Sequence, residues 1–210
     1  MSVVAKRSSM TLFSDARDHY SHRVRMVLAE KGVTVDIVDV DPSKKPDDLG
    51  EINPYNSLPT LLDRDLVLYE ANVIMEYLDE RFPHPPLLPV YPVQRALSRL
   101  WITRVEKEWS TKLDIVLAGK GRETVITKAR KELRESIIAI APIFGEKPFF
   151  MNEEFSLVDC CVAPILWRLK EAGITLPEKS TRPLLKYMHA MFERDAFRES
   201  LTEAEMEMQE

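Results

Sequence analysis

The side chains best suited to chemistry lie in residues 14–20, where hydroxyl, carboxylate and imidazole groups follow a short strand-like run. Ser14 and Tyr20 carry hydroxyls that can donate hydrogen bonds. The imidazoles of His19 and His22 could titrate near neutral pH, although lone histidines at the start of a helix are more often surface residues than acids or bases. These residues alone are therefore only weak evidence for an active site.

The only two cysteines, Cys160 and Cys161, are neighbours. Adjacent side chains in a helix point in different directions, a vicinal disulfide is strained, and a metal site needs more ligands than this pair supplies. We therefore expect both residues to be buried in helix packing, with no metal and no cofactor. The lack of a disulfide framework fits a reducing cytoplasm.

Composition narrows the class of protein further. The chain has 210 residues, of which 45% are apolar and 30% charged, an ordinary globular composition. Its 29 basic and 34 acidic residues give a net charge of −5, which disfavours direct nucleic-acid binding by a broad basic surface. No apolar run approaches the roughly 20 residues of a membrane span, and residues 1–9 lack the apolar centre of a signal peptide. We expect a cytoplasmic protein that binds neither nucleic acid in a sequence-specific way nor membranes.

A proline-rich segment divides the chain. Residues 83–92 contain five prolines, which predicts a stiff, extended connection that is not helical. Before it, short β-branched runs alternate with helical patterns; after it, helical patterns continue almost throughout. We expect an α/β domain over residues 9–86 and an all-α domain over residues 92–206.

The first half predicts the order strand, helix, strand, hairpin, helix. The expected strands cover residues 10–14 and 33–40, and the hairpin covers residues 59–68 with a charged tip. Ser21 is the expected cap of the first helix, which Gly32 ends. The last helix, over residues 69–82, has an expected buried stripe of Val73, Ile74, Tyr77 and Leu78.

The second half predicts four amphipathic helical patterns. They cover residues 93–116, residues 126–144 with an end or kink at Pro142, a helix from Ser156, and residues 184–192. Ser156 and Asp159 have the spacing of a capping box. The acidic end, which includes Glu205 and Glu210, predicts a solvated helix or frayed tail.

This order of elements resembles the glutathione transferase superfamily over essentially the whole chain, and residues 20–32 have a pattern that several of its classes share. Residues 76–93, 154–160 and 200–205 are more specific. They resemble a bacterial branch whose members associate with RNA polymerase holoenzyme and lack transferase activity. The resemblance implies a thioredoxin-like first domain, a homodimer, and regulation of transcription during starvation or stress through protein contacts.

The resemblance also implies a vestigial glutathione site. The Leu58–Pro59 bond matches the cis-proline position, which either presents main-chain groups to glutathione or only holds the fold together; we favour the second interpretation. Glu70 matches the carboxylate at a helix start, but Ala71 stands where a serine is usual. Asp18 lies where a Ser, Cys or Tyr activates the thiol, and its charge would repel a thiolate. A glutathione-dependent transferase or reductase is the alternative function.

The proline segment is our candidate protein-docking surface. Pro83, His84 and Pro85 combine a stiff backbone with an imidazole, and a segment ordered before binding loses less entropy on association. The other expected contact residues are Phe82, Pro86, Leu87 and Tyr91.

The dimer contact should involve the long helix that follows the proline segment. We expect Leu97, Trp101 and Val105 to contribute, together with the helix that starts at Glu70.

Overall fold

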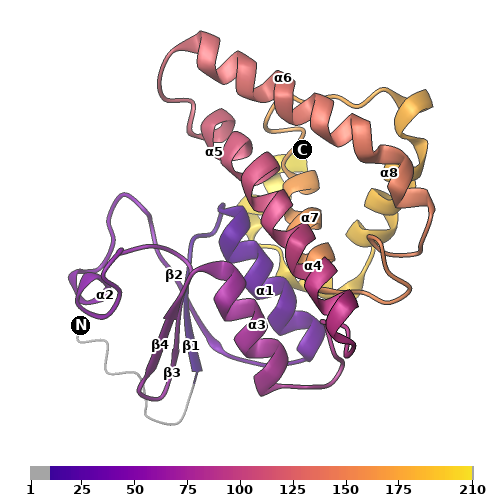
Figure 1. Ribbon diagram of the computed structural model, residues 1–210. Helices are drawn as coiled ribbons and strands as arrows, with labels where there is room; N and C mark the ends of the chain where they lie inside the picture. The colour runs from indigo at the N-terminus through magenta and orange to yellow at the C-terminus, as the bar shows by residue number, and fades with distance from the viewer. Residues whose placement is uncertain (1–9, 210) are drawn as a thin grey trace. The chain divides into compact units, whose positions relative to one another are not determined.

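The computed structural model describes residues 10–209, which form two compact units (Figure 1). The first unit ends at Pro85, and Glu199–Glu207 belong to it as well; the second contains the residues from Pro86 to Arg198 and the final residues from Met208. The boundary falls inside the proline segment. The expected helical domain ran to residue 206, whereas the contacts of residues 199–207 lie in the first unit. The expectations about residues 1–9 and Glu210 lie outside the described residues.

A four-stranded mixed sheet forms the centre of the first unit. Its strands are β1 (Met10–Ser14), β2 (Asp36–Asp39), β3 (Thr60–Asp63) and β4 (Leu66–Tyr69), in the order β2-β1-β3-β4. β1 pairs in parallel with β2, which is shorter than expected, and antiparallel with β3; β3 and β4 form the predicted hairpin. This arrangement confirms the thioredoxin-like α/β half.

Helices cover both faces of this sheet. Phe13 and Leu62 point to one face, where Leu49 of α2 (Asp47–Ile52) packs against them. We did not expect α2. On the side of the sheet opposite α2, α1 (His19–Lys31) and α3 (Ala71–Arg81) pack against each other (Figure 1).

The buried face of α3 differs from the expected stripe. Val73 is 50% exposed, whereas Met75 is fully buried. Tyr77 is half-buried, and its hydroxyl donates a 2.6 Å hydrogen bond to Asp63 Oδ2 at the end of β3. The buried positions Ala71, Ile74, Met75 and Leu78 have helical spacing, but the stripe is rotated by one position from our prediction.

The second unit is helical. Its elements are α4 (Pro92–Val105), a π-helical turn at Glu106–Ser110, α5 (Thr111–Ala118), α6 (Glu123–Ile140), α7 (Leu157–Trp167), α8 (Glu178–Phe192) and α9 (Asp195–Ser200), which crosses into the first unit. Pro92 is the first residue of α4, so the prediction that it lies outside a helix is wrong; a proline lacks only a donor that the first turn leaves unused. Pro142 lies in a 3-10 turn after α6, as the sequence predicted.

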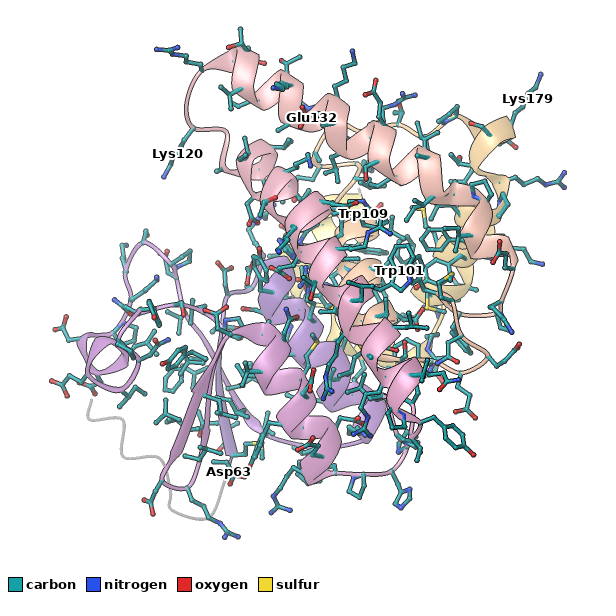
Figure 2. All side chains as sticks on the ribbon, in the orientation of Figure 1. Asp63, Trp101, Trp109, Lys120, Glu132 and Lys179 are labelled. Carbon is teal, nitrogen blue, oxygen red and sulfur yellow. The ribbon has the colours of Figure 1, made fainter. Side chains whose placement is uncertain are left out.

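Two local predictions in the second unit are confirmed around α7. Ser156 and Asp159 form a capping box, in which the Ser156 amide donates to Asp159 Oδ2 at 2.9 Å. Cys160 and Cys161 form no disulfide and are fully buried, as expected. Trp109 is buried beside α4, and its indole Nε1 donates to Ser136 Oγ on α6 at 2.9 Å (Figure 2). No helix within residues 10–209 is long and apolar enough to cross a membrane.

Candidate functional site

Asp18 caps α1 at the position where we looked for a thiol-activating residue. Its backbone is extended, and its Oδ2 accepts a 2.8 Å hydrogen bond from the Ser21 amide. The prediction that Ser21 is the cap is therefore wrong, because Ser21 lies in the first turn. A carboxylate at a helix start is stabilised by the unpaired amides and by the helix dipole. The carboxylate of Asp18 therefore has a structural role.

The nearby serine hydroxyls are also engaged within the fold. Ser14 is fully buried, and Arg25 Nη1 donates to its Oγ at 2.5 Å. Ser21 is fully buried as well, and its Oγ accepts from the Asp15 amide at 3.0 Å. The Arg23 guanidinium lies 4.8 Å from the ring centroid of Tyr20. The serine hydroxyls hold the loop in place, and neither is exposed to a ligand.

Asp15 adds a second acidic group to this loop. Burial raises the pKa of its carboxyl above the ordinary value, and the neighbouring Asp18 charge adds to the rise. A hydrogen bond of 2.8 Å from the Arg17 amide to Asp15 Oδ1 and the charge of Arg25 oppose it. The loop therefore places carboxyl groups where thiol chemistry would need a group that favours a thiolate.

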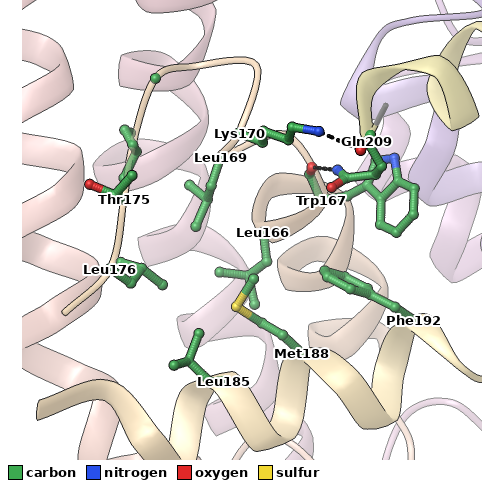
Figure 3. A pocket seen from close by; sticks show the side chains of 12 residues that line it. Leu166, Trp167, Leu169, Lys170, Thr175, Leu176, Leu185, Met188, Phe192 and Gln209 are labelled. Carbon is green, nitrogen blue, oxygen red and sulfur yellow. Dashed lines mark hydrogen bonds between the residues drawn. The ribbon is translucent and has the colours of Figure 1, made fainter. Parts of the chain in front are cut away.

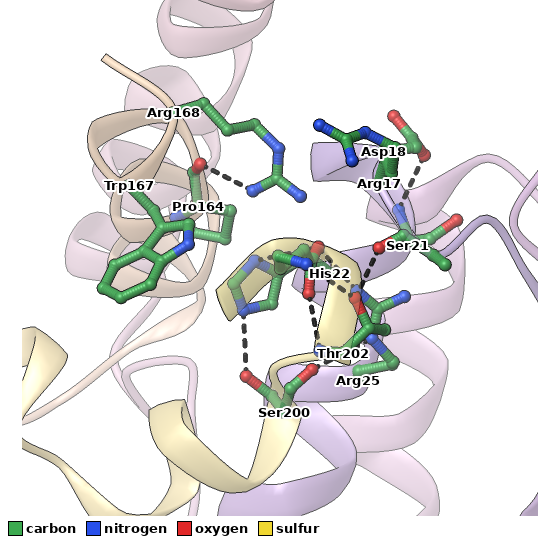
Figure 4. A network of polar contacts seen from close by, with 12 residues as sticks. Arg17, Asp18, Ser21, His22, Arg25, Pro164, Trp167, Arg168, Ser200 and Thr202 are labelled. Atoms are coloured by element: carbon green, nitrogen blue, oxygen red, sulfur yellow. Dashed lines mark hydrogen bonds and ion pairs between the residues drawn. The ribbon is translucent and has the colours of Figure 1, made fainter. Parts of the chain in front are cut away.

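Residues 199–207 bind directly to this loop and to α1 (Figure 4). Thr202 Oγ1 donates to the Ala16 carbonyl at 2.6 Å. Arg25 Nη2 donates to Glu205 Oε1 at 2.7 Å, and Arg25 Nε donates to the Ser200 carbonyl at 3.0 Å. We call residues 199–207 the C-terminal strap, because they tie the end of the chain to the first unit.

The strap corrects two expectations from the sequence. Glu205 is fully buried, so the prediction of a solvated acidic tail is wrong for this residue. His22 is fully buried too, with Nε2 2.9 Å from Ser200 Oγ and Nδ1 3.4 Å from Glu205 Oε1. His19 is also buried. Thr202 and Glu205 form a capping box at α10 (Glu203–Met206), a spacing that the sequence already contained and that we did not use.

The expected vestigial positions keep two backbone features. The Leu58–Pro59 peptide bond is cis, immediately before β3. Glu70 precedes α3 with φ 70° and ψ 113°, values that a non-glycine residue seldom adopts, and its side chain caps no amide. Ala71 is buried in the first turn of α3 and offers no hydroxyl. Glu70 therefore has an unusual backbone conformation, and the residue that follows it provides no hydroxyl.

The proline segment is exposed and anchored at the same time. Pro83, His84 and Pro85 are exposed at the end of the first unit. Lys31 Nζ donates to the Pro85 carbonyl, while the same ammonium lies 2.6 Å from Asp79 Oδ1. A buried ion pair therefore holds the main chain of an exposed loop.

The remaining residues of the expected docking surface have different environments. Phe82 is half-buried, with the Arg81 guanidinium 5.2 Å from its ring centroid. Leu87 is only 2% exposed, so its inclusion in a contact surface was wrong; its carbonyl accepts from the Leu157 amide at 2.8 Å. Pro86 and Tyr91 are exposed in the second unit.

No group of three or more metal-binding side chains occurs within the part of the chain that the structure describes.

Comparison with known proteins defines the class first. Residues 19–81 match the family model of the glutathione S-transferase N-terminal domain, and residues 99–195 match that of its C-terminal domain. A tau class glutathione S-transferase from mango has a TM-score of 0.81 at 25% identity, with 96% of each chain covered. A glutathione S-transferase from Methylobacillus flagellatus with glutathione bound has a TM-score of 0.81 at 27% identity, covering 92% of this chain and 99% of its own. The fold is that of a glutathione transferase.

The curated relatives define a narrower group. A stringent starvation protein A homolog of Pasteurella multocida is 55% identical over 95% of this chain and 93% of its own length. One from Coxiella burnetii is 52% identical over 98% and 97%. The chain belongs to the stringent starvation protein A family, within the glutathione transferase superfamily.

Proposed function

We propose that this protein is a stress-response transcription regulator that acts by direct contact with RNA polymerase holoenzyme and has no transferase activity. The observation that carries the proposal is the engagement of Asp18, Ser14 and Ser21 in the fold itself. In this chain the residues at the expected catalytic position serve only to cap a helix and to pack the loop. The same fold can then act through a protein-binding surface instead of through catalysis. The relatives' name, stringent starvation protein A, supports the stress-response part.

The proposed contact surface centres on Pro83, His84 and Pro85. All three are exposed, and Lys31 holds the carbonyl of Pro85 from inside the first unit. A loop that is ordered before it meets its partner loses little conformational entropy on binding. The net charge of −5 favours a protein surface over a phosphate backbone as the partner.

A triple alanine variant of residues 83–85 tests this surface. We expect it to lose co-purification with polymerase while its thermal unfolding and its oligomeric state stay those of the wild type, because these side chains are exposed. A triple alanine variant of residues 42–44, an exposed proline-containing loop of the same unit, is the matched control and should bind normally. Wild-type binding by the 83–85 variant would contradict the proposed surface.

We also propose a homodimer in the cytoplasm. In α4, Val93, Leu97 and Leu100 are 68%, 52% and 56% exposed, which is an unusual amount of apolar surface on one helix. Val105 is only 3% exposed, so it is too buried to serve in the contact we expected of it. Trp101 is half-buried, and Val73 of α3 is an exposed apolar residue of the first unit.

The alternative is a glutathione-dependent transferase or reductase. The unusual backbone of Glu70 and the cis bond at Leu58–Pro59 favour it, because both would suit a glutathione cradle. Retention on glutathione resin combined with a conjugation assay separates the two functions. We expect no meaningful turnover of a generic electrophile. Robust turnover that disappears when Ser14 or Tyr20 is replaced would support the enzyme instead.

A further inference from the structure

The second unit contains a pocket of about 320 Å³ that the proposed function does not use (Figure 3). It lies between the end of α7, the loop that follows it, the middle of α8 and the final described residue, Gln209. Most of its lining is aliphatic or aromatic. The lining residues used below are Leu166, Lys170, Leu176, Leu185, Met188 and Gln209.

The walls of this pocket are apolar side chains, several of which are still partly exposed to solvent. Leu166 is 1% exposed and belongs to the core, whereas Leu176, Leu185 and Met188 are only half-buried. In Figure 3 these side chains point toward one another around the hollow. An apolar ligand that covers them gains about 25 cal/mol for each Å² removed from water. Since a water molecule takes up about 30 Å³, the pocket suits a ligand of roughly ten non-hydrogen atoms.

Lys170 is an exposed lysine in the lining of this pocket. Lys170 Nζ donates to the main-chain carbonyl of Gln209, and Gln209 Nε2 donates to the Trp167 carbonyl at 2.6 Å (Figure 3). The acceptor that Lys170 uses is thus neutral, and among residues 10–209 its ammonium forms no ion pair. A carboxylate is a stronger acceptor for an ammonium than a carbonyl. A ligand carboxylate at the rim could therefore replace the Gln209 carbonyl.

We propose that this pocket binds a small amphipathic carboxylate, such as a medium-chain fatty acid. Its apolar body lies against Leu176, Leu185 and Met188, and its carboxylate pairs with Lys170. The apolar walls supply most of the affinity, and the ammonium selects an acid over a neutral molecule of the same shape. The inference does not depend on the polymerase surface, since the pocket lining contains none of residues 83–85.

Titration of the full-length protein with decanoate, at concentrations below micelle formation, tests the proposal, with decanol as the neutral probe. We expect saturable binding of decanoate, and a loss of about two- to fivefold in its affinity in Lys170→Met, as for a partly exposed ion pair. Decanol affinity should not change in this variant. Lys179→Met removes another exposed lysine of the same unit that does not line the pocket, and it should alter neither probe (Figure 2).

A second variant and a direct measurement locate the site. Met188→Trp fills the hollow and should abolish binding of both probes while thermal unfolding shows that the protein is folded. Independently of that variant, NMR of the wild type should show decanoate shifting the methyl signals of Leu176, Leu185 and Met188. The proposal is overturned if wild type shows no saturable decanoate binding, if Lys170→Met weakens decanoate and decanol equally, or if the shifted methyl groups lie elsewhere.

Discussion

The ammonium of Lys31 lies 2.6 Å from Asp79 Oδ1, and both side chains are buried between α1 and α3. Lys31 also donates to the carbonyl of Pro85. The pair therefore joins the interior of the first unit to the main chain of the exposed loop at residues 83–85. Lys31 and Asp79 can in this way fix the backbone position of the loop that we propose to contact polymerase.

Replacing Lys31 by methionine should destabilise the protein. The change removes the ammonium from the buried Lys31–Asp79 ion pair, and breaking a buried pair in this way typically costs about 3–5 kcal/mol. Urea unfolding measures the loss, and polymerase binding should weaken under conditions where the variant is still folded, because Pro85 loses its anchor. Lys44→Met, at an exposed position of the same unit, is the control and should stay within about 0.5 kcal/mol of wild type. Equal stability of the two variants would show that the pair has no such role.

Glu205→Gln should loosen the C-terminal strap. One carboxylate oxygen of Glu205 accepts from Arg25 Nη2, and the other accepts from the Thr202 amide at 3.0 Å. A glutamine has only one side-chain oxygen, so its NH2 group must face either Arg25 or the Thr202 amide, both of which are donors. We expect a loss of about 3–5 kcal/mol in the free energy of unfolding, as for other broken buried pairs. Glu203→Gln, two residues earlier and exposed, is the matched control. Hydrogen exchange should show faster amide exchange in residues 199–207 of Glu205→Gln and not in Glu203→Gln. Unchanged exchange in Glu205→Gln would contradict the predicted loosening of the strap.

Asp159 predicts a pH dependence of stability. Burial raises the pKa of its carboxyl from 3.8 to about 6, although hydrogen bonds from the Phe150 amide, the Tyr187 hydroxyl and Ser156 oppose the rise. Between these two pH values the native state binds more protons than the unfolded state. The contribution of Asp159 to stability is therefore greatest below pH ~4 and falls as pH rises through about 6, by on the order of 3 kcal/mol at most.

Asp159→Asn separates this contribution from that of other groups. The variant should lose the stability change that Asp159 contributes between pH ~4 and 6. It should also be less stable at pH 7 by about 1–3 kcal/mol, because the amide nitrogen can no longer accept from Ser156. Asp65→Asn, in the exposed turn of the hairpin, should keep the wild-type profile. Parallel profiles for wild type and Asp159→Asn, measured by urea unfolding at several pH values, would refute the assignment.

Charge on the exposed face of α4 should prevent dimer formation. Leu97→Glu and Leu100→Glu place carboxylates in the proposed isologous contact, where dimer formation would take these charges out of water without a partner of opposite charge. We expect wild type to sediment as a dimer at micromolar concentration and the double variant as a folded monomer. Val125→Glu changes an equally exposed apolar residue on α6 and should remain dimeric. A wild type that sediments only as a monomer would contradict the dimer.

Local signals in the sequence determined the elements and many of their limits. Gly32 ends α1 in the left-handed region, Ser156 and Asp159 cap α7, and Pro142 follows the last turn of α6. Each of these effects acts over a few residues, so the residue types alone predict it. The order of elements resembled the glutathione transferase superfamily, and the matching family models and relatives show that the chain belongs to it.

Only the tertiary structure decided which side chains meet. Arg25 and Glu205 are 180 positions apart, and the capping-box spacing of Thr202 and Glu205 does not predict that this glutamate is buried against Arg25. The apolar repeat from Val93 to Val116 likewise predicted one long amphipathic helix. The structure instead leaves Leu97 exposed before the π-helical turn and buries Leu113 after it. Periodicity reports which residues share a face of a helix, but the packing of the other elements determines whether that face is covered.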